Sequence, residues 1–189
     1  MTPKTPSLSN FSQTAAEGGA SPTGIARRPG QIVCGDIDMR IDRNGVWYYH
    51  GSPIGRKELV KLFATVLRRD EAGAYWLITP AEMARITVED APFLAVELST
   101  IGEGSDQAIS LRTNIDKIVN VDGDHPLRVE IDSETLEPNP YVTLDGNLEA
   151  KLVRPVYYEL VSLGVEELFG DKQIYGVWSN GDFFAIGTL

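Results

Sequence analysis

Residues 45–80, GVWYYHGSPIGRKELVKLFATVLRRDEAGAYWLITP, decide the fold class. An aromatic strand-like run is followed by a basic amphipathic segment and then by a second aromatic run. Ser52-Pro53 is typical of a helix N-terminus, so we expect a helix from there to about Arg69. The apolar side chains of this segment form one stripe on a helical wheel, comprising Leu59, Val60, Leu62, Phe63, Val66 and Leu67. A helix with a single apolar stripe needs a sheet to cover it, which indicates an α+β fold.

Short strands are expected on both sides of this helix. Apolar and charged side chains alternate from Ile37 to Asp42, the two-residue period of a half-buried strand. Asn44-Gly45 suits a tight type I′ turn, so residues 46–50 should return beside that strand as a hairpin. Further strands are expected at 74–79, 84–89, 92–99, 107–113, 117–121 and 126–131. Because turn residues separate nearly all of them, the sheet should be mainly antiparallel.

The order of elements then restarts. Residues 128–189 contain two strands, a helix that begins near Pro155 and is capped by Gly164, and two final strands that turn at Asn180-Gly181. The helical run LVKLFATVL corresponds to LVRPVYYEL, and AYW at 74–76 corresponds to GVW at 176–178. We therefore predict an internal duplication with two similar sheet-plus-helix halves, residues 32–113 and 114–189. The polar, Gly- and Pro-containing residues 1–31 should form a disordered N-terminal tail.

Composition excludes several classes of function. The formal net charge of −10 repels phosphate backbones and anionic lipid, so we expect neither nucleic acid nor a membrane as partner. The sequence lacks an apolar run of the roughly 20 residues that span a bilayer, and its N-terminus lacks a signal-peptide pattern, so a cytoplasmic location is expected. A single cysteine, Cys34, excludes an internal disulfide and a CxxC metal site. Neither common glycine-rich nucleotide motif is present, and no cofactor is predicted.

No catalytic or metal-binding residues are predicted. Asp36, Asp38 and Asp42 alternate with apolar residues, which explains them as the solvent side of a strand without a metal ion. The DGDH segment at 122–125 offers metal-ligand types, but it is also typical of a polar turn. The two histidines, His50 and His125, accompany no GxSxG nucleophile motif. An enzyme that uses carboxylate and tyrosine side chains stays as a third hypothesis.

Charged residues on the predicted helix suggest two different contacts. Lys57, Lys61 and Arg68 lie on one side of the helical wheel, opposite the apolar stripe. They form either a solvated helix face or a docking surface for an acidic protein partner or for the acidic surface of a second copy. Arg56 falls on the apolar side at the helix start, where it must pair with a carboxylate or an anionic ligand.

The aromatic residues allow a core or a ligand site. In the run 46–50, Trp47 and Tyr49 point to one side, and Val46, Tyr48 and His50 to the other. Neither side is plainly polar, so both should be covered. Tyrosine and tryptophan suit both a seam between halves and a ligand cleft, because each has an apolar body and a polar tip.

Three segments, GVWYYHGSPIGRKELVKLF, VLRRDEAGAYWLITPAE and ITVEDAPF, together resemble the bacterial family of unknown function numbered 1285. The similarity extends from about residue 34 to the C-terminus. The resemblance implies a soluble protein of two similar α+β halves, with a conjectured signalling role through a bound small molecule. It implies no catalytic residue.

The leading functional hypothesis is a small-ligand-binding or regulatory protein with its site between the two halves. The candidate ligand-binding residues lie in the segments that match the family: Tyr48, Tyr49, Arg56, Tyr75, Thr79, Glu82, Glu89 and Asp90. Aromatic rings would enclose the ligand, and Arg56 with an acidic residue would orient its polar groups. The alternative is a protein-interaction module that docks an acidic partner through the basic helix face.

Overall fold

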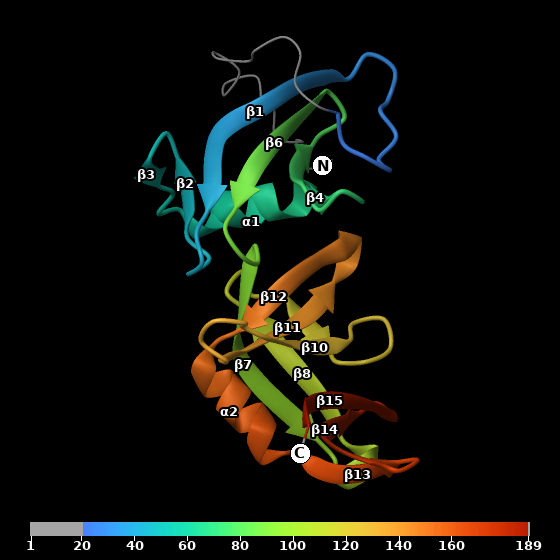
Figure 1. The fold of residues 1–189 in the computed structure, drawn as a ribbon. Coiled ribbons are helices and arrows are strands. Elements are labelled where there is room, and N and C mark those ends of the chain that lie inside the picture. Colours follow the sequence, from blue (N-terminus) through green and yellow to red (C-terminus); the bar gives the residue numbers. More distant parts are fainter. Residues whose placement is uncertain (1–20, 189) are drawn as a thin grey trace. The chain divides into compact units, whose positions relative to one another are not determined.

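The computed structural model describes residues 21–188, and within them the chain folds as two compact units that meet between Pro92 and Phe93 (Figure 1). The sequence had placed this boundary about residue 113, which instead ends a strand inside the second unit. The second unit therefore begins two strands earlier than expected. None of the helices in the described part of the chain is long and apolar enough to span a bilayer.

The first unit contains a six-stranded sheet and one helix. Its elements are β1 (Ile32–Ile41), β2 (Trp47–Tyr49), β3 (Ser52–Pro53), α1 (Lys57–Val66), β4 (Leu67–Arg69), β5 (Tyr75–Ile78) and β6 (Glu82–Val88). The strand order is β3-β2-β1-β6-β5-β4. Two antiparallel meanders, β1–β3 and β4–β6, are thus joined by the parallel pairing of β1 with β6.

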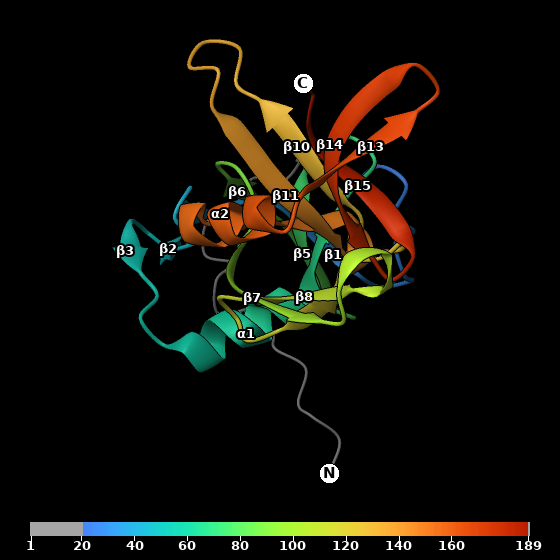
Figure 2. The ribbon, with the colours of Figure 1, turned by 90° about the horizontal axis from the view of Figure 1, so that it is seen from below.

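The second unit repeats this sheet. Its elements are β7 (Phe93–Ile101), η2 (Gly104–Asp106), β8 (Ala108–Thr113), β9 (Ile118–Asn120), β10 (Leu127–Ile131), β11 (Pro138–Leu144), η3 (Asp145–Asn147), β12 (Leu148–Leu152) and α2 (Arg154–Ser162). The order β10-β11-β12-β7-β8-β9 again joins two antiparallel meanders through one parallel pair, β12 with β7. α2 contacts β7 of this sheet (Figures 1 and 2).

The matching sheets confirm the predicted α+β fold with two similar halves. A cross-strand pair repeats with them: Arg69 lies over the Tyr75 ring in β4–β5, and Arg128 lies over the Tyr141 ring in the equivalent β10–β11. The segment-by-segment match inferred from the sequence was wrong, however. α1 lies between the third and fourth strands of its sheet, whereas α2 follows the sixth, so the two helices are not equivalent elements.

A small third sheet follows α2. It contains β13 (Val165–Phe169), β14 (Lys172–Ser179) and β15 (Asp182–Thr188), paired antiparallel in that order. β14 and β15 turn at Asn180-Gly181 as predicted, and both residues have positive φ. Ser179 attaches this sheet to its unit, because its buried Oγ donates to the Val121 carbonyl at 2.6 Å and accepts from the Ile109 N–H at 2.9 Å.

The first hairpin uses a different turn from the predicted type I′. Only Gly45 of the Asn44-Gly45 pair has a positive φ. Its N–H donates to the Asp42 carbonyl at 3.0 Å, and the Asp42 N–H donates to the Val46 carbonyl at 3.0 Å. The Asp42 side chain also accepts from the N–H groups of Asn44 and Val46, both at 2.9 Å. Residues 43–45 therefore form a three-residue hairpin loop in place of the two-residue type I′ loop, and such a loop ends with a residue in the left-handed region, here Gly45.

The helix of the first unit is shorter than predicted. Ser52-Pro53 does not cap it but forms β3, which pairs with Tyr48 and Tyr49 of β2. The backbone of Arg56 is still extended, and α1 ends at Val66 because the following residues join the sheet as β4. Phe63 is the only α1 side chain that is fully buried, and its ring stacks on Trp47 at 6.1 Å between ring centroids. The rest of the predicted apolar stripe on α1 is half-buried or exposed: Leu59, Val60, Leu62 and Val66.

In the second helix, Gly164 has no positive φ, and Leu163 is the C-terminal cap residue. The Leu163 and Gly164 N–H groups donate to the carbonyls of Leu160 and Val161, so the helix closes without the predicted left-handed cap.

Candidate functional site

Two of the predicted ligand-binding residues, Tyr48 and Glu89, belong to one half-exposed polar cluster in the first unit. Arg40 links them: its guanidinium lies 3.9 Å from the centre of the Tyr48 ring and pairs with Glu89 at 2.9 Å. The Tyr48 hydroxyl donates to Asp42 Oδ2 at 3.3 Å. Each charge already has a partner, so this cluster fastens β1, β2 and the end of β6 together. Asp90 follows Glu89 directly.

Two others, Thr79 and Glu82, meet in the tight turn between β5 and β6. The Thr79 hydroxyl accepts from the Glu82 N–H at 3.0 Å and lies 3.2 Å from the Glu82 carbonyl oxygen, to which it can donate. The Gln31 side chain donates to the Thr79 carbonyl at 2.6 Å, and the Ile32 N–H donates to the Ala81 carbonyl at 2.8 Å. The Thr79 and Ala81 carbonyls and the Glu82 N–H of this turn are therefore engaged in hydrogen bonds.

The Glu82 carboxylate lies on the apolar side of the sheet. Side chains alternate along β6, so Glu82 shares its side with Ala84, which pairs with Leu77 of β5; both apolar residues have no exposed surface. Glu82 itself is 7% exposed. Its Oε2 atom is buried and has no hydrogen-bond partner among residues 21–188. Burying a carboxylate oxygen in this way costs free energy that most proteins avoid by pairing it.

α1 covers the same side of the sheet. Val88 lies on the same side of β6 as Glu82 and pairs with Ile41 of β1. Ile41 in turn pairs with Trp47, whose ring stacks on Phe63 of α1. The Trp47 indole N–H is also buried without a partner in the described chain. The Trp47 indole lies near the Val88 end of β6, roughly 20 Å along the strand from Glu82, so the two unpaired groups do not form one site.

The remaining predicted residues are not gathered with Glu82. Tyr49 packs its ring on His50 at 4.1 Å, and Tyr75 is buried beneath Arg69. The prediction that Arg56 lies on the apolar side of the helix was wrong. Because α1 begins at Lys57, Arg56 is the exposed N-terminal cap residue, and its carbonyl accepts the first helical hydrogen bonds.

The three residues of the predicted basic helix face lie on two different elements. Lys57 and Lys61 lie on α1, and Lys61 is 3.5 Å from Glu58. Arg68 lies on β4, where its Nη1 donates to the carbonyls of Thr65 and Leu67 at 3.0 and 2.6 Å. Arg68 thus closes the end of the helix. Docking of an acidic partner through Lys57, Lys61 and Arg68 stays a prediction.

A strap, residues 21–31, crosses the first unit beside these turns, and no sequence pattern indicated it. We expected residues 1–31 to be disordered; residues 1–20 lie outside the described part of the chain, but the strap is attached at two points. At one, the Asp70 carboxylate accepts from the Thr23 N–H at 3.1 Å. At the other, Gln31 reaches Thr79, and its own side-chain oxygen accepts from the Arg28 N–H at 2.9 Å.

Asp70 is the centre of the first attachment. Besides Thr23, its carboxylate accepts from the Ala74 N–H at 2.8 Å and from the Trp76 indole at 2.9 Å. Burial would raise the pKa of Asp70, but these donors together outweigh it and hold the pKa below its ordinary value. The sequence signal was available, since an aspartate followed three residues later by glycine is typical of a turn held by its side chain.

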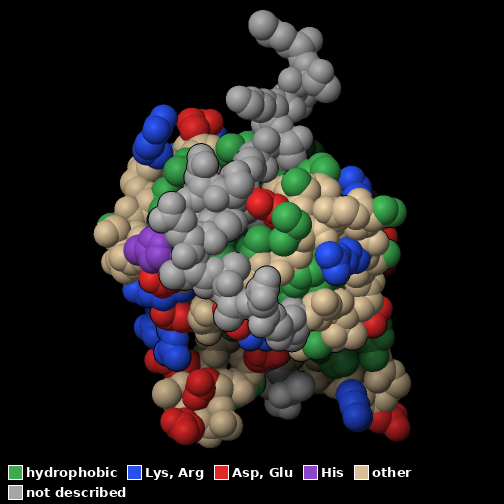
Figure 3. Space-filling model, turned by 90° about the horizontal axis from the view of Figure 1, so that it is seen from above, with side chains coloured by type: hydrophobic (Ala, Val, Ile, Leu, Met, Phe, Trp, Pro, Cys, Tyr) green, Lys and Arg blue, Asp and Glu red, His purple; other side chains and the backbone are tan. Residues whose placement is uncertain are grey.

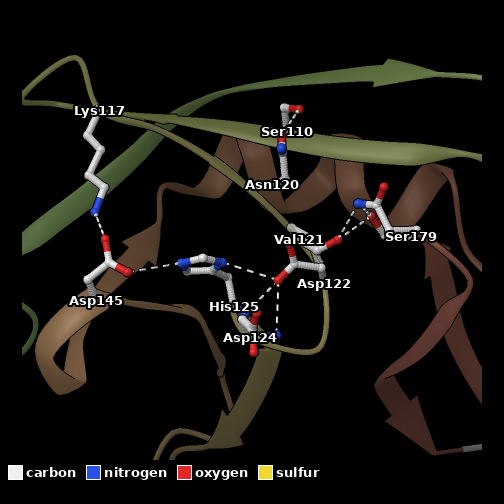
Figure 4. A network of polar contacts seen from close by, with 10 residues as sticks. Ser110, Lys117, Asn120, Val121, Asp122, Asp124, His125, Asp145 and Ser179 are labelled. Atoms are coloured by element: carbon white, nitrogen blue, oxygen red, sulfur yellow. Dashed lines mark hydrogen bonds and ion pairs between the residues drawn. The ribbon is translucent and has the colours of Figure 1, made fainter.

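In the second unit the DGDH segment forms a polar network (Figure 4). Asp122 Oδ1 accepts from the backbone N–H groups of Asp124 and His125 at 3.0 and 2.8 Å. The His125 ring lies between Asp122, at 3.2 Å, and Asp145, at 3.5 Å, and Lys117 pairs with Asp145 at 2.6 Å. The segment thus forms the polar turn that its sequence is typical of, and Asp145 and Lys117 extend the network.

The electrostatics of this network favour the ionised carboxylates. Burial would raise the pKa of Asp122, but the backbone and ring of His125 outweigh it and lower the pKa. The hydrogen bond from Lys117 lowers the pKa of Asp145, and His125 acts in the same direction. Across residues 21–188, no three His, Cys, Asp or Glu side chains are grouped so that they could hold a metal ion.

Two sequence models of protein families match the chain. The model described as "Domain of unknown function (DUF1285), N-terminal domain" matches residues 29–91, and "Protein of unknown function (DUF1285), C-terminal domain" matches residues 92–186. These matches change over within a residue of the point where the two structural units meet. A search of curated proteins gives no match.

Two solved structures are similar. A DUF1285 family protein from Silicibacter pomeroyi DSS-3 shares 36% sequence identity with a TM-score of 0.79, covering 97% of this chain and 96% of its own. A DUF1285 family protein from Shewanella baltica OS155 shares 31% identity with a TM-score of 0.54, covering 66% of this chain and 91% of its own.

Proposed function

Because this chain belongs to the DUF1285 family, whose function is not known, we propose from its own geometry that it is a small-ligand-binding, regulatory protein in which Glu82 holds a cationic group of the ligand. The observation that carries the proposal is the buried Oε2 atom of Glu82, which has no partner in the described chain. An ammonium or guanidinium group supplies the missing donor and the compensating charge.

The surroundings of Glu82 favour a ligand with an apolar body. Ala84 and Leu77 are its neighbours on the sheet, and both are fully buried apolar side chains. Figure 3 views the molecule from the end at which β1 and β6 begin, and hydrophobic side chains are exposed on that face. A few placed polar groups in apolar surroundings are typical of small-molecule sites.

The net charge of the whole chain also favours a cationic ligand. With a net charge of −10, the protein attracts small cations and repels anions at a distance. A cation that reaches Glu82 is held in a region of low dielectric, where pairing is strong. An anionic ligand would add a second unpaired negative charge beside the first.

A thermal-shift panel of simple cations tests this proposal on the full chain. Methylguanidine, butylamine and putrescine serve as probes, and butyrate is the anionic control of similar size. A probe at ten times its Kd should stabilise the protein by about 1.4 kcal/mol, and the Tm of a domain of this size should rise by roughly 5 °C or more.

Two variants make the panel specific. Glu82→Gln removes the charge and should abolish the rise in Tm. Glu89→Gln removes a half-exposed carboxylate of the same unit that is already paired with Arg40, and it should retain the rise. An equal response in Glu82→Gln, or no response to any cation in the wild type, would contradict the proposal.

A further inference from the structure

Strand β13 is an exposed edge of the third sheet. It pairs with β14 on one side only, and no described strand lies beside its other edge (Figure 1). Three of its five residues are exposed apolar side chains: Val165 at 39%, Leu168 at 71% and Phe169 at 49%. Natural edge strands are usually blunted by charged side chains, proline or a bulge. β13 contains no proline and pairs in continuous register, and its only charged residues are Glu166 and Glu167. Such an edge is a template for a further strand.

An aromatic surface lies next to this edge. The Phe169 ring is 5.2 Å from the Phe183 ring, which is 5.2 Å from the Trp178 ring. The register places Phe169 and Trp178 on the same side of the sheet as Phe183. Trp178 and Phe183 are only partly buried, so this row of rings can pack against the side chains of an added strand.

The acidic residues of β13 decide which strand it can accept. Glu166 and Glu167 occupy the centre of the strand, one on each side, and Glu167 accepts from the Trp178 indole at 3.0 Å. Antiparallel pairing of β13 with a second copy places these glutamates opposite one another, and like charges directly opposite are destabilising. A strand that alternates basic and apolar residues is complementary to both sides.

We propose that β13 binds an extended, basic and apolar segment of a partner protein by strand addition. Main-chain hydrogen bonds to the free edge supply affinity, and Glu167 with the rings of Phe169, Phe183 and Trp178 selects lysine or arginine next to apolar side chains. This surface lies in the second unit and does not depend on Glu82.

The test uses the full chain and a ten-residue peptide of alternating lysine and valine, with the Kd measured by titration calorimetry. A second peptide has the same sequence but N-methyl groups on alternate residues, which remove the backbone donors and keep the charge. Strand addition predicts that N-methylation weakens binding by at least about tenfold, the change that 1.4 kcal/mol produces.

Protein variants separate the surface from the general charge of the chain. Phe169→Ala and Glu166→Lys/Glu167→Lys should each weaken binding at least about tenfold. Glu103→Lys/Glu134→Lys makes the same change in net charge at exposed sites elsewhere and should alter Kd by less than about threefold. Leu136→Ala, an exposed apolar truncation on another loop, is the control for Phe169→Ala.

Several outcomes would overturn the proposal. Equal binding of the N-methylated peptide would mean that attraction is only electrostatic, and an equal loss in Glu103→Lys/Glu134→Lys would mean the same. A wild-type dimer in sedimentation that Phe169→Ala dissociates would assign the edge to pairing between copies instead. No binding of the lysine–valine peptide at millimolar concentration would also refute it.

Discussion

Asp70→Asn should lower the free energy of unfolding of the first unit by about 3 kcal/mol, because it disrupts charge-assisted hydrogen bonds in a buried place. Asp70 Oδ2 accepts from both the Thr23 N–H and the Trp76 indole, and Oδ1 accepts from the Ala74 N–H. All three partners are donors. An asparagine amide presents its own NH2 group to at least one of them, so a donor faces a donor in either orientation.

The effect should depend on pH. The pKa of Asp70 is lower in the folded state than the ordinary value of about 3.9. A lowered folded pKa contributes stability that is present above the unfolded pKa and is lost as pH falls through the folded value. The difference between wild type and Asp70→Asn should therefore be full at neutral pH and should shrink below about pH 4.

Urea unfolding followed by tryptophan fluorescence measures this difference, since Trp47 and Trp76 both lie in the first unit. Trypsin provides a second measurement: loss of the Thr23 contact should accelerate cleavage after Arg27 in the strap, whereas the bond after Arg28 precedes Pro29 and resists trypsin. Asp38→Asn is the matched control, an exposed aspartate paired with His50, and should change stability by less than about 0.5 kcal/mol. Equal stability of Asp70→Asn and Asp38→Asn would show that the Asp70 hydrogen bonds contribute nothing measurable to the free energy of unfolding.

Glu82→Leu should have the opposite effect and raise the free energy of unfolding by about 2 kcal/mol. The substitution removes a buried carboxylate whose Oε2 has no partner in the described chain and places an apolar side chain beside Ala84 and Leu77. A side chain that lowers stability is typical of a functional site. The same variant should lose the response to cations described above.

The second unit offers a matched control for Glu82→Leu. Glu149 lies on β12, the strand equivalent to β6, and its two oxygens accept from Arg128 at 2.6 and 3.0 Å. The Glu149 hydrogen bonds raise the pKa of Arg128, which reflects the strength of this pairing. Glu149→Leu should therefore lower stability, in contrast to Glu82→Leu. If Glu82→Leu is also destabilising in urea unfolding, the carboxylate has a structural partner and the proposed role for it is refuted.

Strand positions could be predicted because they depend on local signals, whereas the duplication was predicted correctly from a match of helices that are not equivalent. The alternation from Ile37 to Asp42 and the turn at Asn180-Gly181 reflect periods and φ angles that neighbouring residues determine. The parallel pairing of β1 with β6 could not be predicted, since the partners Ile32 and Glu82 are fifty positions apart and no local pattern links them. The error at Ser52-Pro53 has the same origin, because pairing with β2 overrides a local preference for a helix start.

The candidate site was predicted only in part. Glu82 and Thr79 were chosen for their place in segments that resemble the family, and the structure brings these two together. Arg56 was misplaced because its position on the helical wheel depended on a helix start that the sheet moved to Lys57. The strap was missed because its attachment uses backbone N–H groups and two side chains, Asp70 and Gln31, and not apolar burial.

Native mass spectrometry of the full chain, purified gently from its host, tests the central claim most directly. Wild type and Glu82→Gln are compared in the native and denatured states. Recognition of a cationic ligand by Glu82 predicts a small excess mass on the native wild type that denaturation releases as a basic compound, and no such mass on Glu82→Gln. The same bound mass on both proteins, or none on either, would contradict it.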